Sequence, residues 1–162
     1  MDKPTLYLET SVIGYLAMRA SKDVIVTAHQ QVTQTFWTKR RDNYQLFVSR
    51  YVIDECSAGD PTAASERMFF LDGIPLIELS SEIDDLAEAL IRGVQLPPKA
   101  IVDAYHIASA AYGGIEYLLT WNCTHIANGA LRGKVEAICR SHNYEPPAIC
   151  TPEELLEIDD VS

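Results

Sequence analysis

Short apolar runs along the chain alternate with longer segments in which apolar residues recur at helical spacing. The runs at 4–9, 44–49, 74–79 and 115–120 are typical of buried strands, and PAICT at 147–151 predicts a fifth strand at a sheet edge. Between them, the spacing predicts helices over 10–19, 27–41, 51–58, 62–71, 81–93, 99–112 and 133–142. Alternating strands and helices predict an α/β fold with a parallel sheet of four to five strands, covered on both faces.

Capping residues indicate where several of these helices begin and end. Thr10 or Ser11 is placed to cap the first helix. Ser80 or Ser81 is placed to cap the helix over 81–93, which Gly93 closes. The helix over 99–112 follows a turn forced by two prolines and ends at two glycines.

The length of 162 residues predicts one domain, because no linker or low-complexity segment divides the chain. We expect this domain to occupy 1–150 and an acidic tail with a short helix to occupy 151–162. The chain has 13 basic and 23 acidic side chains, a net charge of −10, and the tail holds five of the acids. This charge argues against a general polyphosphate-coating role, but not against a local site where metal ions offset phosphate charge.

The sequence also bears on location and on the cysteines. No run of eighteen apolar residues and no signal-peptide pattern is present, which predicts a cytoplasmic protein without a membrane partner. The four cysteines include no C-x-x-C pair and are expected to be reduced thiols, packed mostly as small apolar side chains. Cys123 and His125 are spaced for half of a zinc site, but no second pair lies at a suitable spacing.

Polar residues follow three of the predicted strands. In a parallel sheet, ligands bind beyond the carboxyl ends of the strands, so these residues are the first candidates for a site. Glu9 and Thr10 follow the first strand, Thr120 and Asn122 follow the fourth, and Glu55 lies a short step beyond the second. Each has an ordinary structural explanation, such as a solvated acid or a turn-forming amide, and their joint placement is the stronger signal.

Asp103 lies one turn into a helix, AIVDAYHIASAAY, that is apolar on nearly every side. Such a helix is buried, and an ionised aspartate there costs several kcal/mol unless it is paired or bound to metal. The alternative is a first-turn aspartate stabilised by the helix dipole. His106 lies on the same side of this helix, where it either orients a phosphate or fills space with a satisfied ring nitrogen. Glu55 is preferred to Asp54 because it projects from the packed side of its helix.

Three carboxylates and an amide in one crevice form a site of hard oxygen ligands. Oxygen ligands select Mg²⁺ or Mn²⁺ over zinc or copper. Such an ion lowers the pKa of a water molecule enough for it to attack a phosphodiester, and it reverses the local charge in an acidic protein.

Several segments resemble the motifs of PIN-domain nucleases, in the same order and over most of the chain from about Thr5 to Ile149. They are YLETSVIGYL, VIDECSAGD and PPKAIVDAYHIASAAYGGIEYLLTWN. The resemblance implies a compact three-layer α/β fold with a central, mostly parallel sheet and acids that bind magnesium or manganese. The small single-domain members are mostly toxins of VapBC-type toxin–antitoxin modules, which are endoribonucleases inhibited by a cognate antitoxin and usually dimeric.

Matched by position, the resemblance implies catalytic and metal-binding roles for Glu9, Glu55, Asp103 and Asn122. Thr10 and Thr120 at the strand ends and His106 beside Asp103 are the candidates for positioning substrate. The sequence departs from the family twice, because Asp is more usual where Glu9 stands and is frequent where Asn122 stands. An amide at Asn122 lowers the negative charge of the site and weakens the binding of a second metal ion.

The leading hypothesis is therefore a magnesium- or manganese-dependent endoribonuclease whose partners are RNA, an antitoxin protein and a second copy of the chain. The alternative is a catalytically weak or inactive PIN-fold module that binds RNA or protein, which the amide at Asn122 favours. A nucleotide-binding protein is poorly supported, because neither Gly-rich phosphate-binding motif occurs. On the second helix, Val32 and Phe36 are expected to be core residues, with Trp37 as the interface candidate.

Overall fold

A computed structural model describes the backbone of residues 2–161 and the side chains of residues 2–156. Its strands are β1 (Thr5–Leu8), β2 (Gln45–Phe47), β3 (Tyr117–Leu119) and β4 (Ala148–Cys150). They form one parallel sheet in the order β2-β1-β3-β4. The helices are α1 (Thr10–Ala17), α2 (Val24–Lys39), α3 (Arg50–Cys56), α4 (Pro61–Leu71), α5 (Ser81–Val94), α6 (Ile101–Tyr112), α7 (Gly129–Ser141) and α8 (Pro152–Val161), with short 3-10 turns at Arg41–Asn43 and Pro98–Ala100.

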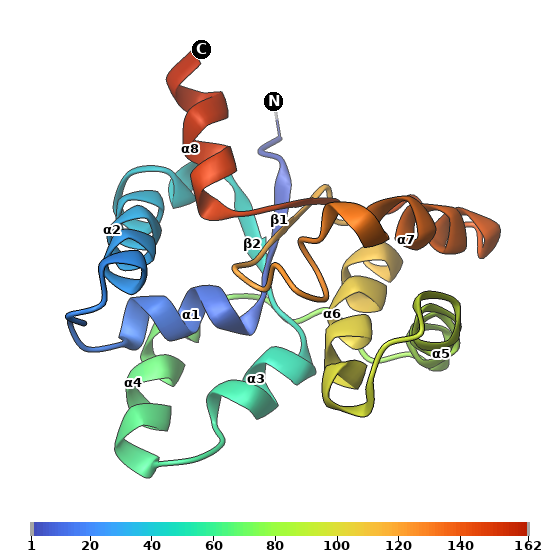
Figure 1. Cartoon of the computed structure of the whole chain (residues 1–162), viewed down its shortest axis with the longest axis horizontal. Coiled ribbons are helices and arrows are strands. Elements are labelled where there is room, and N and C mark those ends of the chain that lie inside the picture. The colour runs from blue at the N-terminus through green and yellow to red at the C-terminus, as the bar shows by residue number, and fades with distance from the viewer. Residues whose placement is uncertain (1, 162) are drawn as a thin grey trace.

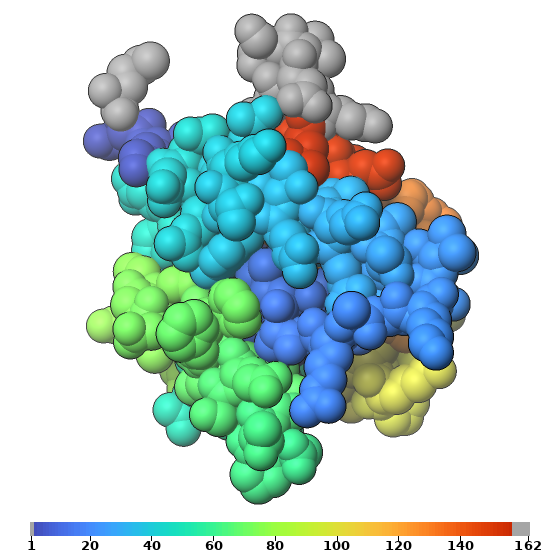
Figure 2. Space-filling model, turned by 90° about the vertical axis from the view of Figure 1, so that its left-hand side faces the viewer, coloured from blue at the N-terminus to red at the C-terminus, as the bar shows by residue number. Residues whose placement is uncertain are grey.

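The sheet lies between two layers of helices. In Figure 1, α1, α2 and α4 lie on one side of the sheet and α5, α6 and α7 on the other. Figure 2 looks onto the first of these layers, where α1 (blue) lies between α2 (cyan) and α4 (green). Leu6, Tyr7 and Leu8 of β1 are fully buried, because helices cover both faces of this central strand. The predicted α/β fold is confirmed, and it is consistent with a PIN-like three-layer architecture.

The predicted strand over 74–79 is wrong. In this segment, Leu76 forms an isolated bridge with Val48 beyond the end of β2. Leu76 and Leu79 are 50% and 61% exposed, so their apolar side chains line the outside of the molecule rather than a buried strand. Pro75 also lacks the N–H that a strand interior requires.

Two predicted helix ends differ from the structure. Glu9 occupies the N-cap position of α1, and the predicted caps Thr10 and Ser11 lie inside the first turn. The prediction that Gly93 closes α5 is wrong, because α5 continues to Val94 and its C-cap is Gln95, with φ 58°. Gly93 instead lies where α7 approaches closely, since a Cβ at this position would meet Ile138 Cδ1 at 2.4 Å. The predicted cap at Ser80 is confirmed, because its side chain accepts a hydrogen bond from the backbone of the first turn.

The acidic C-terminal segment begins as part of the fold. Its helix, α8, packs on α2, and Leu155 is 1% exposed within the main core. The apolar core therefore extends past residue 150 into this segment. In the described part of the chain, no helix combines the length and apolar character needed to cross a membrane.

Candidate functional site

Three helices surround the carboxyl end of β1. Figure 1 shows this end of β1 above α1 and α3, with α6 beside it. Glu9 follows β1 directly, Glu55 comes from α3, and Asp103 and His106 come from α6. Asn122 lies in the loop that follows β3, the strand beside β1. The sequence-predicted residues therefore reach this edge from four separate segments of the chain.

Glu9 is 5% exposed and is held by two hydroxyl groups. Its Oε1 accepts hydrogen bonds from Ser11 Oγ and from Thr120 Oγ1, the second at 2.6 Å. Both hydroxyls also accept backbone N–H groups of the loop after β3, from Trp121 and Asn122. Among the described residues, no group donates a hydrogen bond to Glu9 Oε2, so this oxygen is left for a ligand.

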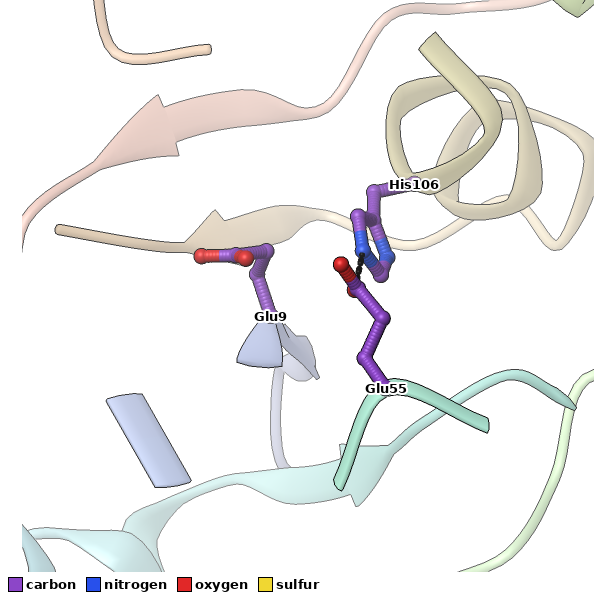
Figure 3. Close-up of side chains that lie close together, drawn as sticks. All are labelled: Glu9, Glu55 and His106. Atoms are coloured by element: carbon purple, nitrogen blue, oxygen red, sulfur yellow. Dashed lines mark hydrogen bonds and ion pairs between the residues drawn. The ribbon is translucent and has the colours of Figure 1, made fainter. Parts of the chain in front are cut away.

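Glu55 is paired with a histidine from the opposite layer of helices. Glu55 Oε1 accepts hydrogen bonds of 2.6 Å from His106 Nε2 and from Thr10 Oγ1. Figure 3 shows Glu55 extending toward the His106 ring, while the Glu9 carboxylate extends to the other side in that view. Burial raises the pKa of the Glu55 carboxyl, but His106 and Thr10 together outweigh burial and bring the pKa below its ordinary value. Glu55 is therefore ionised at neutral pH.

His106 is in turn held from the core. Its Nδ1 lies 2.7 Å from the hydroxyl of Tyr7, which lies 2.6 Å from Ser49 Oγ. Burial is the main cause that raises the pKa of Tyr7 well above its ordinary value; a hydrogen bond with Ser49 opposes it and the charges of Glu9 and Glu55 add to it. Tyr7 thus keeps its proton and can donate it to Nδ1 while Nε2 donates to Glu55.

Asp103 belongs to a second group beside the first. Its Oδ2 lies 3.3 Å from His125 Nδ1, and its side chain is 15% exposed. Burial raises the pKa of Asp103 and the charge of Glu9 adds to this effect, whereas Asn122, His106 and His125 lower the pKa. The net shift is upward, so the ionised form of Asp103 is stabilised less here than in water.

Asn122 supports this second group through its loop. Its Oδ1 accepts a hydrogen bond of 3.1 Å from the backbone N–H of His125, which closes a turn. One lone pair of the only side-chain oxygen of Asn122 is therefore already used. The carboxamide lowers the pKa of Asp103, which is the effect of a donor rather than of another anion.

The structure brings together some of the predicted site residues and separates others. Ligand atoms of Glu9, Glu55 and His106 all lie within 4.8 Å of one another, and Asp103 is not part of that group. Glu9 lies between the two groups, because its charge also raises the pKa of Asp103. A single ion held tightly by Glu9, Glu55 and Asp103 thus requires movement of these side chains or bridging water molecules.

The three residues expected to position substrate have other contacts. His106 is fully buried and uses both ring nitrogens inside the protein, so it has no surface for a phosphate and instead orients Glu55. The hydroxyls of Thr10 and Thr120 donate to Glu55 and Glu9. These three side chains therefore position carboxylates.

Sequence reasoning missed the roles of Tyr7, Ser11, Ser49 and His125. Tyr7 carries a polar tip inside an apolar strand, which is a usable signal for a buried hydrogen bond. His125 was considered only beside Cys123, whereas the structure pairs it with Asp103 and leaves Cys123 exposed as a free thiol. Ser11 bonds to Glu9 only two residues away, but its second partner Trp121, and the Tyr7 partner of Ser49, lie too far along the chain to be predicted from spacing.

The donor set fits a hard divalent cation. Glu9, Glu55 and Asp103 supply carboxylate oxygens, which suit Mg²⁺ or Mn²⁺. Across the described side chains, no Lys or Arg lies within ion-pair distance of these three carboxylates, although His106 pairs with Glu55 and His125 with Asp103. The negative charge at this edge of the sheet is therefore not balanced by Lys or Arg side chains.

Comparison with known proteins adds no relative. No protein-family model matches the chain, and no curated protein matches its sequence.

Tyr7→Phe tests the chain of hydrogen bonds that runs from Ser49 through Tyr7 and His106 to Glu55. The substitution removes one hydroxyl and leaves the buried Ser49 Oγ and His106 Nδ1 without their partner. We expect the free energy of unfolding, measured by urea denaturation, to fall by about 1–3 kcal/mol. Tyr117→Phe on β3 is the matched control, since Tyr117 is not part of this chain of hydrogen bonds. Equal losses of stability in both variants would contradict the role assigned to the Tyr7 hydroxyl.

Proposed function

We propose that the protein is a magnesium- or manganese-dependent endoribonuclease that hydrolyses RNA phosphodiester bonds. The observation that carries the proposal is the cluster of Glu9, Glu55 and His106 at the carboxyl edge of a parallel sheet, with Asp103 beside it. Among the described residues, the three carboxylates form no ion pair with Lys or Arg. The order of the PIN-like motifs along the chain supports the same activity.

In this proposal, Glu9, Asp103 and Glu55 would hold the metal ion, in part through bridging water molecules, and Asn122 would complete the set of ligands. A bound divalent ion supplies positive charge for the phosphate and lowers the pKa of an attacking water molecule. Ser11 and Thr120 fix Glu9, while His106 and Thr10 fix Glu55 in its ionised form. The protein groups therefore enter the reaction already oriented.

The net charge of −10 makes a cation necessary for tight RNA binding, because the chain as a whole repels phosphate. The four cysteines are free thiols, three of them buried, which supports the cytoplasmic location proposed for this enzyme.

The proposal includes a protein partner, namely an antitoxin, and a second copy of the chain. An apolar groove of about 710 Å³ supports a protein partner; it is lined by Leu16, Pro61, Phe69 and Phe70, and Phe69 is 76% exposed. Phe36 is buried in the core, as expected, and Trp37 packs edge-on against Phe70 near this groove.

The second candidate is a non-catalytic RNA- or protein-binding module on the same fold. Asn122 favours it, because an amide with one lone pair already used gives a weaker site for a second ion. This candidate binds RNA without cutting it, which separates it from the first.

A cleavage assay on RNA of mixed sequence tests the proposed function. We expect cleavage in Mg²⁺ or Mn²⁺, loss of cleavage in EDTA, and recovery when Mn²⁺ is restored in excess. Cleavage that persists in EDTA would contradict metal dependence. RNA binding without cleavage in either ion would favour the binding module.

A further inference from the structure

Three aromatic rings meet beside the carboxylates. His29 and Trp121 stack with ring centroids 4.0 Å apart and an angle of 14° between the rings. Tyr15 meets both in an edge-on arrangement, at 5.6 Å from His29 and 6.0 Å from Trp121. All three rings are partly exposed, so each has a portion of its surface available to a ligand.

This aromatic cluster (Tyr15, His29 and Trp121) is held rigidly at the site. Trp121 Nε1 donates to Thr33 Oγ1 at 2.8 Å, and the Trp121 backbone N–H donates to Ser11 Oγ at 2.9 Å. The hydroxyl of Ser11 itself donates to Glu9. One serine therefore connects the aromatic cluster to a carboxylate, and the rings are ordered before any ligand arrives.

A groove of about 760 Å³ between α1 and α4 runs from this point. Ser11 and Tyr15 both line it, so one of its walls lies between the aromatic cluster and Glu9. This volume is in the range of small-ligand sites. Tyr15 is the aromatic side chain in its lining, and Ser11, which donates to Glu9, connects this end of the groove to the carboxylate.

The charges along the groove permit a phosphodiester. Arg19 and Arg67 line it together with Asp60 and Glu66, so its formal charge is balanced although the chain carries −10. Arg67 is fixed by donating through Nε and Nη2 to the carbonyls of Cys56 and Ala58, and Nη1 lies outside those two bonds. The groove thus suits a flat apolar group joined to one or two phosphates.

We propose that the end of the groove bordered by Ser11, Tyr15 and Arg19 binds a nucleoside next to the cleaved phosphodiester of single-stranded RNA, with its base against Tyr15. A base must be unpaired and unstacked to lie against a protein ring, so the site selects single strands over duplex RNA. This inference rests on the proposed nuclease function for the position of the cleaved bond, but base binding itself does not require catalysis.

The test measures binding of a short fluorescein-labelled oligoribonucleotide of mixed sequence by fluorescence anisotropy, with Ca²⁺ in place of Mg²⁺. We expect Tyr15→Leu to weaken binding about tenfold or more and Tyr15→Phe to leave it nearly unchanged. Phe69→Leu, in the apolar part of the neighbouring groove, is the matched control and should leave binding unchanged. A version of this RNA that carries abasic nucleotides should bind weakly to the wild-type protein. Its affinity should match the affinity of intact RNA for Tyr15→Leu.

Each result separates the base site from the nuclease. Equal binding of intact RNA by wild type and Tyr15→Leu overturns the base site, whether or not RNA is cleaved. Equal losses in Tyr15→Leu and Phe69→Leu, or no RNA binding by wild type, also overturn it. Binding that depends on Tyr15 without any cleavage in Mg²⁺ or Mn²⁺ supports the base site and overturns the nuclease.

Discussion

Asp103→Asn is expected to reduce metal-dependent RNA cleavage by about 10²-fold or more while the fold is retained. The amide keeps the size of the side chain and its place beside His125, but it removes the negative charge that a divalent cation requires. Steady-state cleavage of labelled RNA in Mn²⁺ measures the loss. Asp42→Asn, at a side chain that is 94% exposed, is the matched control and should keep full activity.

The stability of Asp103→Asn gives an independent check with a definite sign. The folded state raises the pKa of Asp103 above the ordinary value of 3.8, mainly through burial. The stability linked to protonated Asp103 is therefore complete below that value and is lost as pH rises through the folded pKa. Without metal at neutral pH, Asp103→Asn should be at least as stable as wild type, and its advantage should disappear in acid. A variant that unfolds more easily at pH 7 would contradict this account of Asp103.

Glu9→Gln is expected to weaken Mn²⁺ binding and RNA cleavage by about 10²-fold or more, with little change in stability. Glutamine retains an oxygen that accepts the hydroxyls of Ser11 and Thr120, so the link between α1 and the loop after β3 remains. Isothermal titration with Mn²⁺ separates the loss of metal binding from the loss of catalysis. Unchanged Mn²⁺ affinity would remove Glu9 from the metal site.

Two further substitutions separate the charge of Glu9 from its structural role. Glu9→Ala leaves both hydroxyls without an acceptor and should also lower the free energy of unfolding by about 1–3 kcal/mol. Glu88→Gln, at an exposed position of α5, makes the same charge change away from the site and should have neither effect.

The sequence predicted the parallel sheet well because its strands are short apolar runs and its helices carry clear end signals. It failed at 74–79, where the composition of IPLIEL matches a buried strand although the chain lies along the outside of β2. It also failed at Gly93, because the sequence does not distinguish a glycine required by close helix packing from one that ends a helix. Both errors arise where tertiary contacts, rather than local preference, decide the conformation.

The candidate site was predicted in part for a similar reason. The rule that strand ends carry the site placed Glu9 and Glu55 at one edge of the sheet, and an acid inside an apolar helix indicated Asp103. It could not place His106, because a histidine one turn after Asp103 is equally compatible with contact to solvent and with full burial. The side-chain contacts show that His106 lies beneath Glu55 and that His125 faces Asp103. These pairings join α6 to α3 and to the loop after β3, and helical spacing does not predict contacts between separate segments.

The hydroxyl of Tyr7 lies in the middle of the central strand, yet through His106 it determines the orientation of a surface carboxylate. The side chain at this position of β1 must therefore both fill space in the core and donate one oriented hydrogen bond. An apolar side chain of equal volume fills the space but cannot donate the hydrogen bond. Fewer residue types should therefore be tolerated at Tyr7 than at Leu6 or Leu8, its equally buried neighbours.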